Sequence, residues 1–281
     1  MHRRSISHQF SGWQPDRIDV GMSTLMNTCD SILPGDCLER LPGLAEASAS
    51  GRLSVELAYL DPPFATGKRQ TGRAGHAYED SWPSIEAWID FMRPRLEAVL
   101  ATLSPTGAIL VHCDWRTSHH LRVMLEDLLG PDHFQNHLIW QYGLGGSSPK
   151  RFARKHDDIL FYTASAKTWY FDPPLVPATS QRLRGQMKKS TDVLDVPSIN
   201  NMAHERTGWP TQKPIALLDL LVRACCPPGG TVLDPMCGSG TTLVAAAASG
   251  RHYIGFDRSP EAVAIARGRL DGLPKIALAA G

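Results

Sequence analysis

A carboxylate, two prolines and an aromatic ring stand together at Asp61-Pro62-Pro63-Phe64. The preceding run, 53–60, is apolar enough for a buried strand, and successive prolines cannot continue a strand ladder because they lack N–H donors. The strand must therefore end here and present Asp61 and the proline carbonyls at its carboxyl end, where open α/β sheets bind ligands. The run predicts an active-site corner, although a plain strand stop with a capping aspartate would contain the same residues.

A second group, around Gly238-Ser239-Gly240, has the composition of a binding loop. A short apolar strand over 230–234 leads into the Gly-x-Gly turn and then into an alanine-rich helix expected over 243–248. Glycines let a ligand approach the backbone closely, and the free N–H groups of a helix start suit a polar or anionic group. The third glycine of the dinucleotide fingerprint and the Gly-Lys-Ser/Thr of a phosphate loop are both missing, which argues against nicotinamide and ATP.

Acidic residues follow the strands of this half of the chain. Asp234 ends the first strand, and Asp257 ends a second one expected over 252–257. An acid at the end of the second strand holds ribose hydroxyls in nucleoside-binding α/β folds. Asp234, at the end of the first strand, suits an amino-acid ammonium group. The pair describes S-adenosylmethionine, with a helix cap before Ser259 as the alternative for Asp257. Asp36, by itself, is best explained as an N-cap.

Helix and strand signals alternate in the segments that must position these residues. Apolar residues recur at helical spacing over 84–103, a buried strand is expected over 107–112, and a further helix over 117–129. This β-α-β-α order is typical of a parallel sheet. Further strands are expected over 137–142 and 158–163. The pattern predicts an α/β fold with a mostly parallel sheet and helices on both faces.

Cations gather in three connecting segments, although the formal net charge of the 281 residues is only +1. Any nucleic-acid surface must therefore be a local patch. Such cations can neutralise phosphates, and the neighbouring 169–171 aromatics can stack on bases; an ordinary solvated surface is the other explanation. The cations expected to contact DNA are Lys68, Arg69, Arg73, Lys150, Arg151, Arg154, Lys155, Arg182, Arg184, Lys188 and Lys189.

Composition and length indicate the domain organisation, the state of the cysteines and the location of the protein. The chain is long enough for one large domain, which we expect over 31–281 after an N-terminal arm over 1–30, with an inserted lobe over 143–205. The six cysteines have neither zinc-ligand nor secreted-scaffold spacing, which indicates reduced thiols and no metal site. No apolar run reaches the roughly 18 residues of a membrane span. A cytoplasmic protein that does not associate with membranes is expected.

Four motifs in their order along the chain resemble the prokaryotic β-class DNA amino-methyltransferases, which methylate adenine N6 or cytosine N4. In chain order, the four motifs are Gly35-Asp36-Cys37-Leu38, Asp61-Pro62-Pro63-Phe64, Trp209-Pro210-Thr211-Gln212-Lys213-Pro214 and Asp234-Pro235-Met236-Cys237-Gly238-Ser239-Gly240-Thr241-Thr242. The resemblance covers about 31–270. It implies a Rossmann-like S-adenosylmethionine-dependent methyltransferase fold in which the catalytic half comes first, a target-recognition region occupies 143–205, and the cofactor half follows.

The resemblance also assigns roles to residues. Asp36, with Cys37 beside it, would lie near the cofactor adenine, and Asp257 would hold the ribose. The methionine end would be met by Thr211, Gln212 and Lys213, and wrapped by Asp234, Pro235, Met236, Cys237, Gly238, Ser239, Gly240, Thr241 and Thr242. Met236 departs from the family, which usually carries an aromatic residue there, but a flexible thioether can fill the same space.

The expected chemistry is methyl transfer to the exocyclic amine of a flipped base, because a base inside a duplex hides this amine. Asp61, Pro62, Pro63 and Phe64 would form the catalytic corner: Asp61 and the Pro62 carbonyl would accept the amine protons, and Phe64 would stack on the base. In the family, Asp or Asn at the first position usually accompanies adenine and Ser usually accompanies cytosine, so Asp61 favours adenine N6 slightly over cytosine N4.

The resemblance implies double-stranded DNA as partner, together with a homodimer and a cognate restriction endonuclease as further candidates. Three other functions explain part of the sequence. A non-catalytic DNA-binding module would use the basic lobe alone, and a nucleotide-dependent oxidoreductase would use the Gly-x-Gly turn but leave the Asp61 corner unexplained. A methyltransferase for RNA or protein amides is chemically closest, but the motif order and the basic lobe favour DNA.

Overall fold

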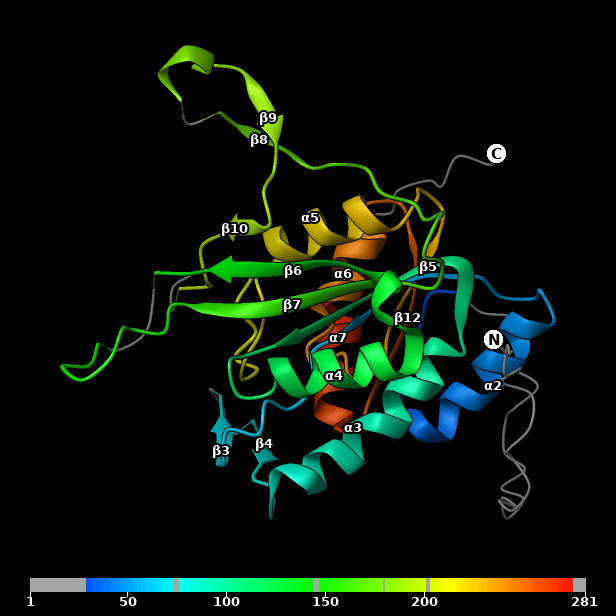
Figure 1. Cartoon of the computed structure of the whole chain (residues 1–281). Coiled ribbons are helices and arrows are strands. Elements are labelled where there is room, and N and C mark those ends of the chain that lie inside the picture. Colours follow the sequence, from blue (N-terminus) through cyan, green and yellow to red (C-terminus); the bar gives the residue numbers. More distant parts are fainter. Residues whose placement is uncertain (1–28, 73–75, 144–146, 179, 201–202, 275–281) are drawn as a thin grey trace.

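The computed structural model describes residues 29–72, 76–143, 147–178, 180–200 and 203–274 of the chain (Figure 1). The expected arm over 1–30 lies outside the described residues except for its last two positions, and so does Arg73.

An eight-stranded sheet forms the middle of the molecule, with the strand order β1-β12-β11-β2-β5-β7-β6-β10. Neighbours from β1 through β5 are parallel, whereas β7 runs antiparallel to both β5 and β6. The prediction of a mostly parallel α/β sheet is confirmed. In chain order the strands are β1 (Ser31–Pro34), β2 (Val55–Leu60), β5 (Leu103–Cys113), β6 (Phe134–Gln141), β7 (His156–Thr163), β10 (Val193–Asp195), β11 (Thr231–Asp234) and β12 (His252–Asp257).

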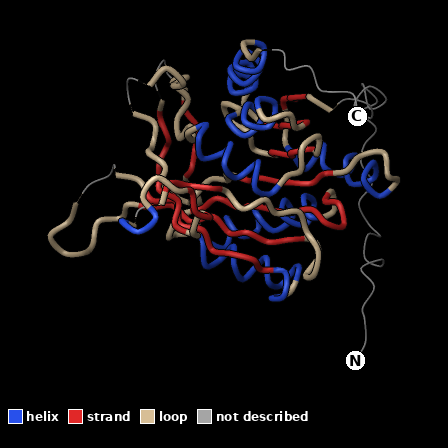
Figure 2. The backbone as a smooth tube through the Cα atoms, turned by 90° about the horizontal axis from the view of Figure 1, so that it is seen from above, coloured by secondary structure: helices blue, strands red, loops and turns tan. Residues whose placement is uncertain are grey.

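Helices cover both faces of the sheet, as the view from above shows (Figure 2). One layer consists of α2 (Cys37–Ala49), α3 (Ile85–Leu100) and α4 (Ser118–Leu129), and the other of α5 (Ile215–Cys225), α6 (Thr241–Ala248) and α7 (Pro260–Asp271). Successive residues of β2 point to opposite layers. Leu60 belongs to the buried cluster that contains Trp88 of α3, and Leu57 to the cluster that contains Leu217 of α5.

The boundaries of α3 show how local signals set an element. The Ser84 hydroxyl accepts a hydrogen bond from Ala87 N at 3.3 Å and caps the first turn. The apolar stripe that includes Trp88 and Leu96 is fully buried. The helix ends at Leu100, three residues before the predicted end, because Leu103 begins β5 and pairs with Val55 of β2.

Smaller elements project from this body. The hairpin of β3 (Lys68–Thr71) and β4 (Ala77–Asp80) follows the Asp61 corner, and the hairpin of β8 (Leu175–Pro177) and β9 (Met187–Lys189) stands away from the sheet (Figure 1). Short 3₁₀ helices lie at η2 (Pro131–His133) and η3 (Gln181–Leu183). Within 143–205, β7 and β10 are members of the central sheet. Among the described residues of that range, the parts outside the sheet are therefore the β6–β7 connector, the segment between β7 and β10, and the stretch after β10.

The order of the strands brings the two halves of the chain together. β2 and β11 are direct neighbours, with Ala58 opposite Leu233. Asp61 follows β2 and Asp234 is the last residue of β11, so both acids lie at the carboxyl ends of adjacent strands, as expected. None of the helices within the described ranges is long and apolar enough to cross a membrane.

Gly240 offers a test of the packing between α6 and α7. It has a φ of 75°, and a Cβ at this position would lie 2.6 Å from the Ala266 Cβ of α7. Gly240→Ala is expected to destabilise the protein by about 2–5 kcal/mol, because the left-handed conformation costs a side chain about 1–2 kcal/mol and overpacking adds about 1–3 kcal/mol.

Gly268→Ala in α7 is the matched control, since a Cβ there would meet nothing within 4 Å. It is expected to stabilise the protein by about 0.5–1 kcal/mol, as for any glycine inside a helix. Urea unfolding monitored by circular dichroism measures both changes, and equal midpoints for the two variants would contradict this account of Gly240.

Candidate active site

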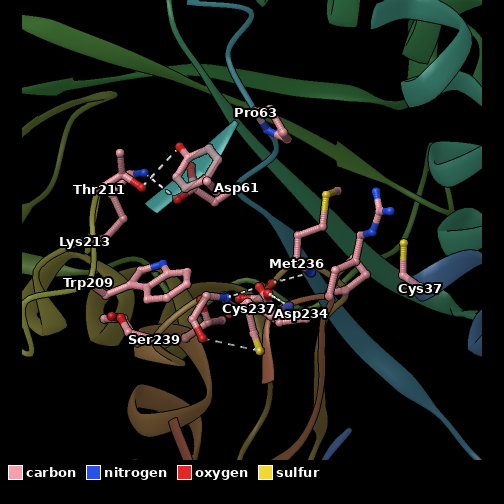
Figure 3. A pocket seen from close by; sticks show the side chains of 18 of the residues that line it. Cys37, Asp61, Pro63, Trp209, Thr211, Lys213, Asp234, Met236, Cys237 and Ser239 are labelled. Carbon is pink, nitrogen blue, oxygen red and sulfur yellow. Dashed lines mark hydrogen bonds and ion pairs between the residues drawn. The ribbon is translucent and has the colours of Figure 1, made fainter. Parts of the chain in front are cut away.

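A cavity of about 450 Å³ opens at the carboxyl edge of the sheet (Figure 3). Residues from both halves of the chain line it, including Asp61 and Pro63 from the corner and Asp257 from the end of β12. The other predicted residues among its walls are Asp36, Cys37, Thr211, Gln212, Lys213, Asp234, Pro235, Met236, Cys237, Gly238, Ser239, Thr241 and Thr242. Segments far apart in sequence thus share one site.

A smaller cavity of about 130 Å³ adjoins the corner on its other side. Pro62 and Phe64 line this second cavity and not the larger one. Asp61 lines both, as do Tyr78, Thr211 and Lys213. The Asp61 carboxylate therefore stands between a large chamber and a small one.

The corner itself is braced by buried hydrogen bonds. Trp88 of α3 donates its Nε1–H to the Pro63 carbonyl at 2.8 Å. Asp80, almost fully buried at the end of β4, accepts from Ala65 N at 3.0 Å and from Thr66 N at 3.1 Å. Because these bonds hold the backbone on both sides of Phe64, its ring has a defined position.

Lys213 lies directly on the corner. Its Nζ donates to Asp61 Oδ2 at 2.5 Å and is 5.2 Å from the centre of the Phe64 ring. The sequence assigned Lys213 to the methionine end of the cofactor, whereas in the structure its charge is paired with Asp61. Breaking a buried pair by removing one partner is costly, so the two side chains act as a unit.

Asp234 is the most strongly perturbed acid of the site. It is buried at the end of β11, and this burial raises the pKa of Asp234 to about 7. Hydrogen bonds from Thr242 and from Met236 N counteract the shift in pKa, and the charges of Asp61 and Asp257 add to it. A carboxyl group in this situation gains a great deal from a cationic partner.

Asp257 shows a similar situation. Burial raises the pKa of Asp257, while its oxygens accept hydrogen bonds from Gly238 N and Ser259 N, each at 2.8 Å. Each oxygen retains a lone pair that can accept from a ligand hydroxyl. With Asp61 and Asp234 nearby, the larger cavity is acidic, which suits a ligand that carries positive charge and hydroxyl groups.

Asp36 caps a helix and also lines the larger cavity. Its side chain accepts from Leu38 N at 3.0 Å and so caps α2, as the cap alternative predicts. Arg95 of α3 also donates to both of its oxygens, at 2.7 and 3.0 Å. Sequence reasoning missed Arg95; the signal for it was a charged residue on the otherwise apolar face of α3 between Met92 and Leu96.

Two residues of the predicted set have mainly structural contacts. Gly240 does not line the cavity, and its lack of a side chain serves the close approach of α7. The Gln212 amide accepts from Thr207 N and donates to the Glu205 carbonyl, at 2.8 and 2.7 Å. Gln212 lines the cavity, but its amide oxygen and nitrogen form hydrogen bonds within the loop that carries Lys213.

The cysteines of the cavity are inert thiols. Burial raises the pKa of Cys37 to about 11 and raises that of Cys237 as well. A thiol that is protonated at neutral pH is a weak nucleophile. Neither cysteine of the cavity is therefore suited to act as a nucleophile.

Ten further residues that line the larger cavity had been assigned no site role from the sequence. Tyr78 and Glu79 belong to β4, which carries no motif. Arg258 and Ser259 directly follow Asp257, and this position next to a predicted residue was the only sequence signal for them. The lining residues missed are Tyr59, Tyr78, Glu79, Ser81, Trp82, Phe91, Arg95, Trp209, Arg258 and Ser259. The second Asp-Pro-Pro, at Asp172, lines neither cavity.

The predicted DNA-contacting cations lie on three projecting segments. Lys68 and Arg69 are exposed on β3, and the β8–β9 hairpin with η3 carries Arg182, Arg184, Lys188 and Lys189. The β6–β7 connector carries Lys150, Arg151, Arg154 and Lys155. The Arg154 guanidinium stacks 3.4 Å from the centre of the Trp115 ring, just beyond β5.

Comparison with known proteins identifies the class. Residues 55–268 match the DNA methylase family of adenine-N6 and cytosine-N4 enzymes, and the chain belongs to this family. It is therefore an S-adenosylmethionine-dependent DNA amino-methyltransferase whose acceptor is the exocyclic amine of adenine or cytosine. This membership decides against the oxidoreductase alternative.

Several individual proteins are similar to it. Type II methyltransferase M.ScaI of Streptomyces caespitosus is 29% identical, with 87% of this chain and 82% of the relative covered. DNA adenine methyltransferase YhdJ of Escherichia coli K12 is 28% identical, with 87% and 84% covered.

Solved structures share the fold. The M1.HpyAVI complex with S-adenosylmethionine has a TM-score of 0.58 at 21% identity, covering 86% of this chain and 98% of its own. The cytosine-N4-specific PvuII DNA methyltransferase has a TM-score of 0.62 at 18% identity, covering 89% and 88%.

The raised pKa of Asp234, about 7, predicts a pH-dependent affinity for S-adenosylmethionine. Asp234 is the predicted partner of the cofactor's ammonium group, which needs the ionised carboxylate, so the affinity is expected to rise with pH and to reach its plateau above the pKa of Asp234. Between pH 6 and 7.5 we expect a roughly tenfold gain, measured by isothermal titration calorimetry. This pH range lies below the pKa of the cofactor's own amino group, which is about 8.

Asp234→Asn is the control for this effect. It should bind S-adenosylmethionine weakly at every pH in the window, because the amide cannot become charged. A wild-type affinity that does not change between pH 6 and 7.5 would contradict the role of Asp234.

Proposed function

We propose that the chain methylates adenine N6 of a flipped base, with the base in the smaller cavity and S-adenosylmethionine in the larger one. One observation carries the proposal: Asp61 lines both cavities. The group that meets the target amine must reach the boundary between base and methyl donor, and the Asp61 carboxylate occupies that boundary.

The residues of the larger cavity fit the cofactor. Asp234 would accept the ammonium group and Asp257 the ribose hydroxyls, as their unshared lone pairs and raised pKa values support. Met236 and Phe91 add apolar walls, and Arg95 holds Asp36 in place beside Cys37. When bound, S-adenosylmethionine supplies an electrophilic methyl group on a sulfonium.

The corner residues would prepare the amine. Its lone pair is delocalised into the ring of the base, and hydrogen bonds from its protons to Asp61 and to the Pro62 carbonyl would favour a tetrahedral nitrogen. An amine that gains a methyl group must lose one proton, and Asp61 is the acceptor within reach. Positioning and electrostatics account for this catalysis.

Phe64 and Lys213 would complete the base site. Phe64 lines the smaller cavity and offers an aromatic surface to the flipped base. Lys213 keeps the Asp61 carboxylate directed to the boundary through its ion pair. The approach of the amine would then add a second donor to Asp61 without leaving Lys213 unpaired.

Two observations favour adenine. The corner begins with Asp61, which in the resembling family is usual for adenine enzymes. YhdJ, whose name describes an adenine methyltransferase, is similar over 87% of the chain, whereas the cytosine-N4-specific PvuII enzyme is similar in fold alone.

Asp61→Ala is expected to lower the rate of methyl transfer about a hundredfold or more while S-adenosylmethionine still binds. Asp61→Asn retains the shape of the side chain and an acceptor oxygen, and Asn is usual at this position in adenine enzymes of the resembling family, so it should retain more of the rate than Asp61→Ala. Transfer is measured with tritiated cofactor on DNA from a methylation-free host, and nucleoside mass spectrometry identifies the product as N6-methyladenine.

Asp172→Ala is the matched control, since it changes the same residue type in the other Asp-Pro-Pro and should leave the rate unchanged. Retained transfer by Asp61→Ala would refute the assignment of the corner. N4-methylcytosine as the product would refute the preference for adenine alone.

The proposal extends to the surface that meets double-stranded DNA. The β3–β4 hairpin and the β6–β7 connector project on the same side of the molecule (Figure 1). On the connector, Phe152 is 98% exposed, next to Arg151 and near Arg154. An exposed aromatic side chain between cations suits a nucleic acid, whose phosphates meet the cations and whose bases can stack on the ring.

Arg154→Ala is expected to weaken DNA binding and to lower the slope of log affinity against log salt by about 1, because one phosphate contact is lost. Arg223→Ala on α5, an exposed arginine paired with Asp219, should leave the slope unchanged. Fluorescence anisotropy across a salt series measures both. Equal slopes for the wild type and Arg154→Ala would remove Arg154 from the DNA surface.

The proposal also includes a partner endonuclease, a cellular location and an oligomeric state. M.ScaI and M.HpaI are named Type II methyltransferases, which supports a cognate restriction endonuclease that cuts the same sequence. A DNA substrate supports a cytoplasmic location, and a homodimer is proposed from the resemblance to β-class enzymes. Analytical ultracentrifugation tests the homodimer, with sedimentation as a monomer at micromolar concentration as the contrary result.

A further inference from the structure

A buried histidine lies directly behind the corner. His112, near the end of β5, is fully buried, and its ring stacks on that of Phe64 with centres 5.7 Å apart and planes 17° apart. Tyr59 of β2 contacts the Nδ1 of this histidine through its hydroxyl at 2.8 Å. Asp157 of β7 lies at 3.2 Å from the Nε2 on the opposite side of the ring.

The protonation states of the neighbours define the direction of these bonds. Burial raises the pKa of Tyr59 well above its ordinary value, so the phenol keeps its proton and donates to Nδ1. Burial also acts on Asp157, but hydrogen bonds from His112 and Tyr142 outweigh it and lower the pKa of Asp157, so the carboxylate accepts from Nε2–H. Both ring nitrogens are thereby satisfied.

Two bonds at opposite ends of the ring prevent it from turning. A leucine or phenylalanine could fill the same volume, but nothing would fix its plane. Buried polar groups cost free energy unless all of them are hydrogen-bonded. If packing were the only requirement, an apolar side chain would meet it without this cost. The arrangement therefore restrains the plane of His112 and, through the stack, that of Phe64.

The network continues to the base of the DNA-facing connector. Tyr142, just after β6, donates its hydroxyl to Asp157 Oδ1 at 3.0 Å, and its backbone N–H donates to the Lys155 carbonyl at 2.9 Å. Trp140 packs edge-on against both His112 and Tyr142, with ring centres 5.6 and 5.1 Å away. A continuous set of contacts thus joins the connector to Phe64.

We propose that His112 is a positioning residue that fixes the plane of Phe64 for stacking of the flipped base, and that Asp157 and Tyr142 hold His112 in register with the β6–β7 connector. The proposal rests on the proposed function, in which Phe64 receives the base. His112 lines neither of the two cavities and acts only through Phe64.

His112→Phe keeps the ring and removes both hydrogen bonds. We expect single-turnover methyl transfer to fall by tenfold or more, since small misplacements at a reacting centre carry penalties of this size. The dissociation constants for S-adenosylmethionine and DNA should stay within twofold. With 2-aminopurine as the target base, fluorescence in the ternary complex should rise, because the flipped base stacks less well on Phe64.

A double-mutant cycle separates positioning from general stability. In a Phe64→Ala background, His112→Phe should lower the rate no further, because the ring on which it acts is gone. Additive effects in this cycle, or a wild-type rate for His112→Phe, would overturn the proposal.

Tyr142→Phe provides the same test if His112→Phe does not fold. It removes one hydroxyl from Asp157 and is expected to lower the rate less than His112→Phe but in the same non-additive manner. Tyr162→Phe is its control, since that hydroxyl contacts the Arg122 carbonyl on the other helix layer. An inactive wild type would refute the proposed function, whereas additive cycles in an active wild type would refute the role of His112 alone.

Discussion

The parallel pairing of β2 with β11 is the contact on which the rest of the site depends. The two strands come from opposite halves of the chain, and Ala58 lies opposite Leu233 in their register. Because parallel strands end at the same edge, this pairing sets Asp61 and Asp234 side by side. A slip of one residue would turn the side chains of β2 to the opposite helix layers and exchange the two buried clusters. The Asp61 corner and the larger cavity are therefore specified by the same hydrophobic alternation that folds the sheet.

Acidic charge is the main energetic cost of this arrangement. Asp61, Asp234 and Asp257 converge on one cavity, and the charges of Asp61 and Asp257 add to the cost of ionising the buried Asp234. The protein offsets the charge of Asp61 with Lys213 and that of Asp36 with Arg95. Among the described residues no basic side chain hydrogen-bonds to Asp234, and its raised pKa makes it the acid that gains most from a cationic ligand. In the proposed function, the affinity for the cofactor and the electrostatic cost of the cavity thus have one physical origin.

Several motif residues serve the scaffold of the site more than its ligand. Gly240 allows α7 to approach α6, Gln212 braces the loop before α5, and the Trp88 indole holds the Pro63 carbonyl. The buried set formed by Tyr59, His112 and Asp157 extends this scaffold behind Phe64. A rigid outer shell of this kind is what keeps a binding constellation within the narrow geometry that chemistry needs.

The sequence alone determined the fold class, the corner and the acids at the strand ends. These features depend on local patterns: an apolar run stopped by Pro62 and Pro63, a Gly-x-Gly turn before a helix, and helical spacing along α3. Tertiary structure decided which charges meet. The pairing of Lys213 with Asp61, of Arg95 with Asp36, and of His112 with Phe64 joins side chains on different elements. No local pattern encodes these contacts, because they arise only when the order and register of the strands bring the elements together.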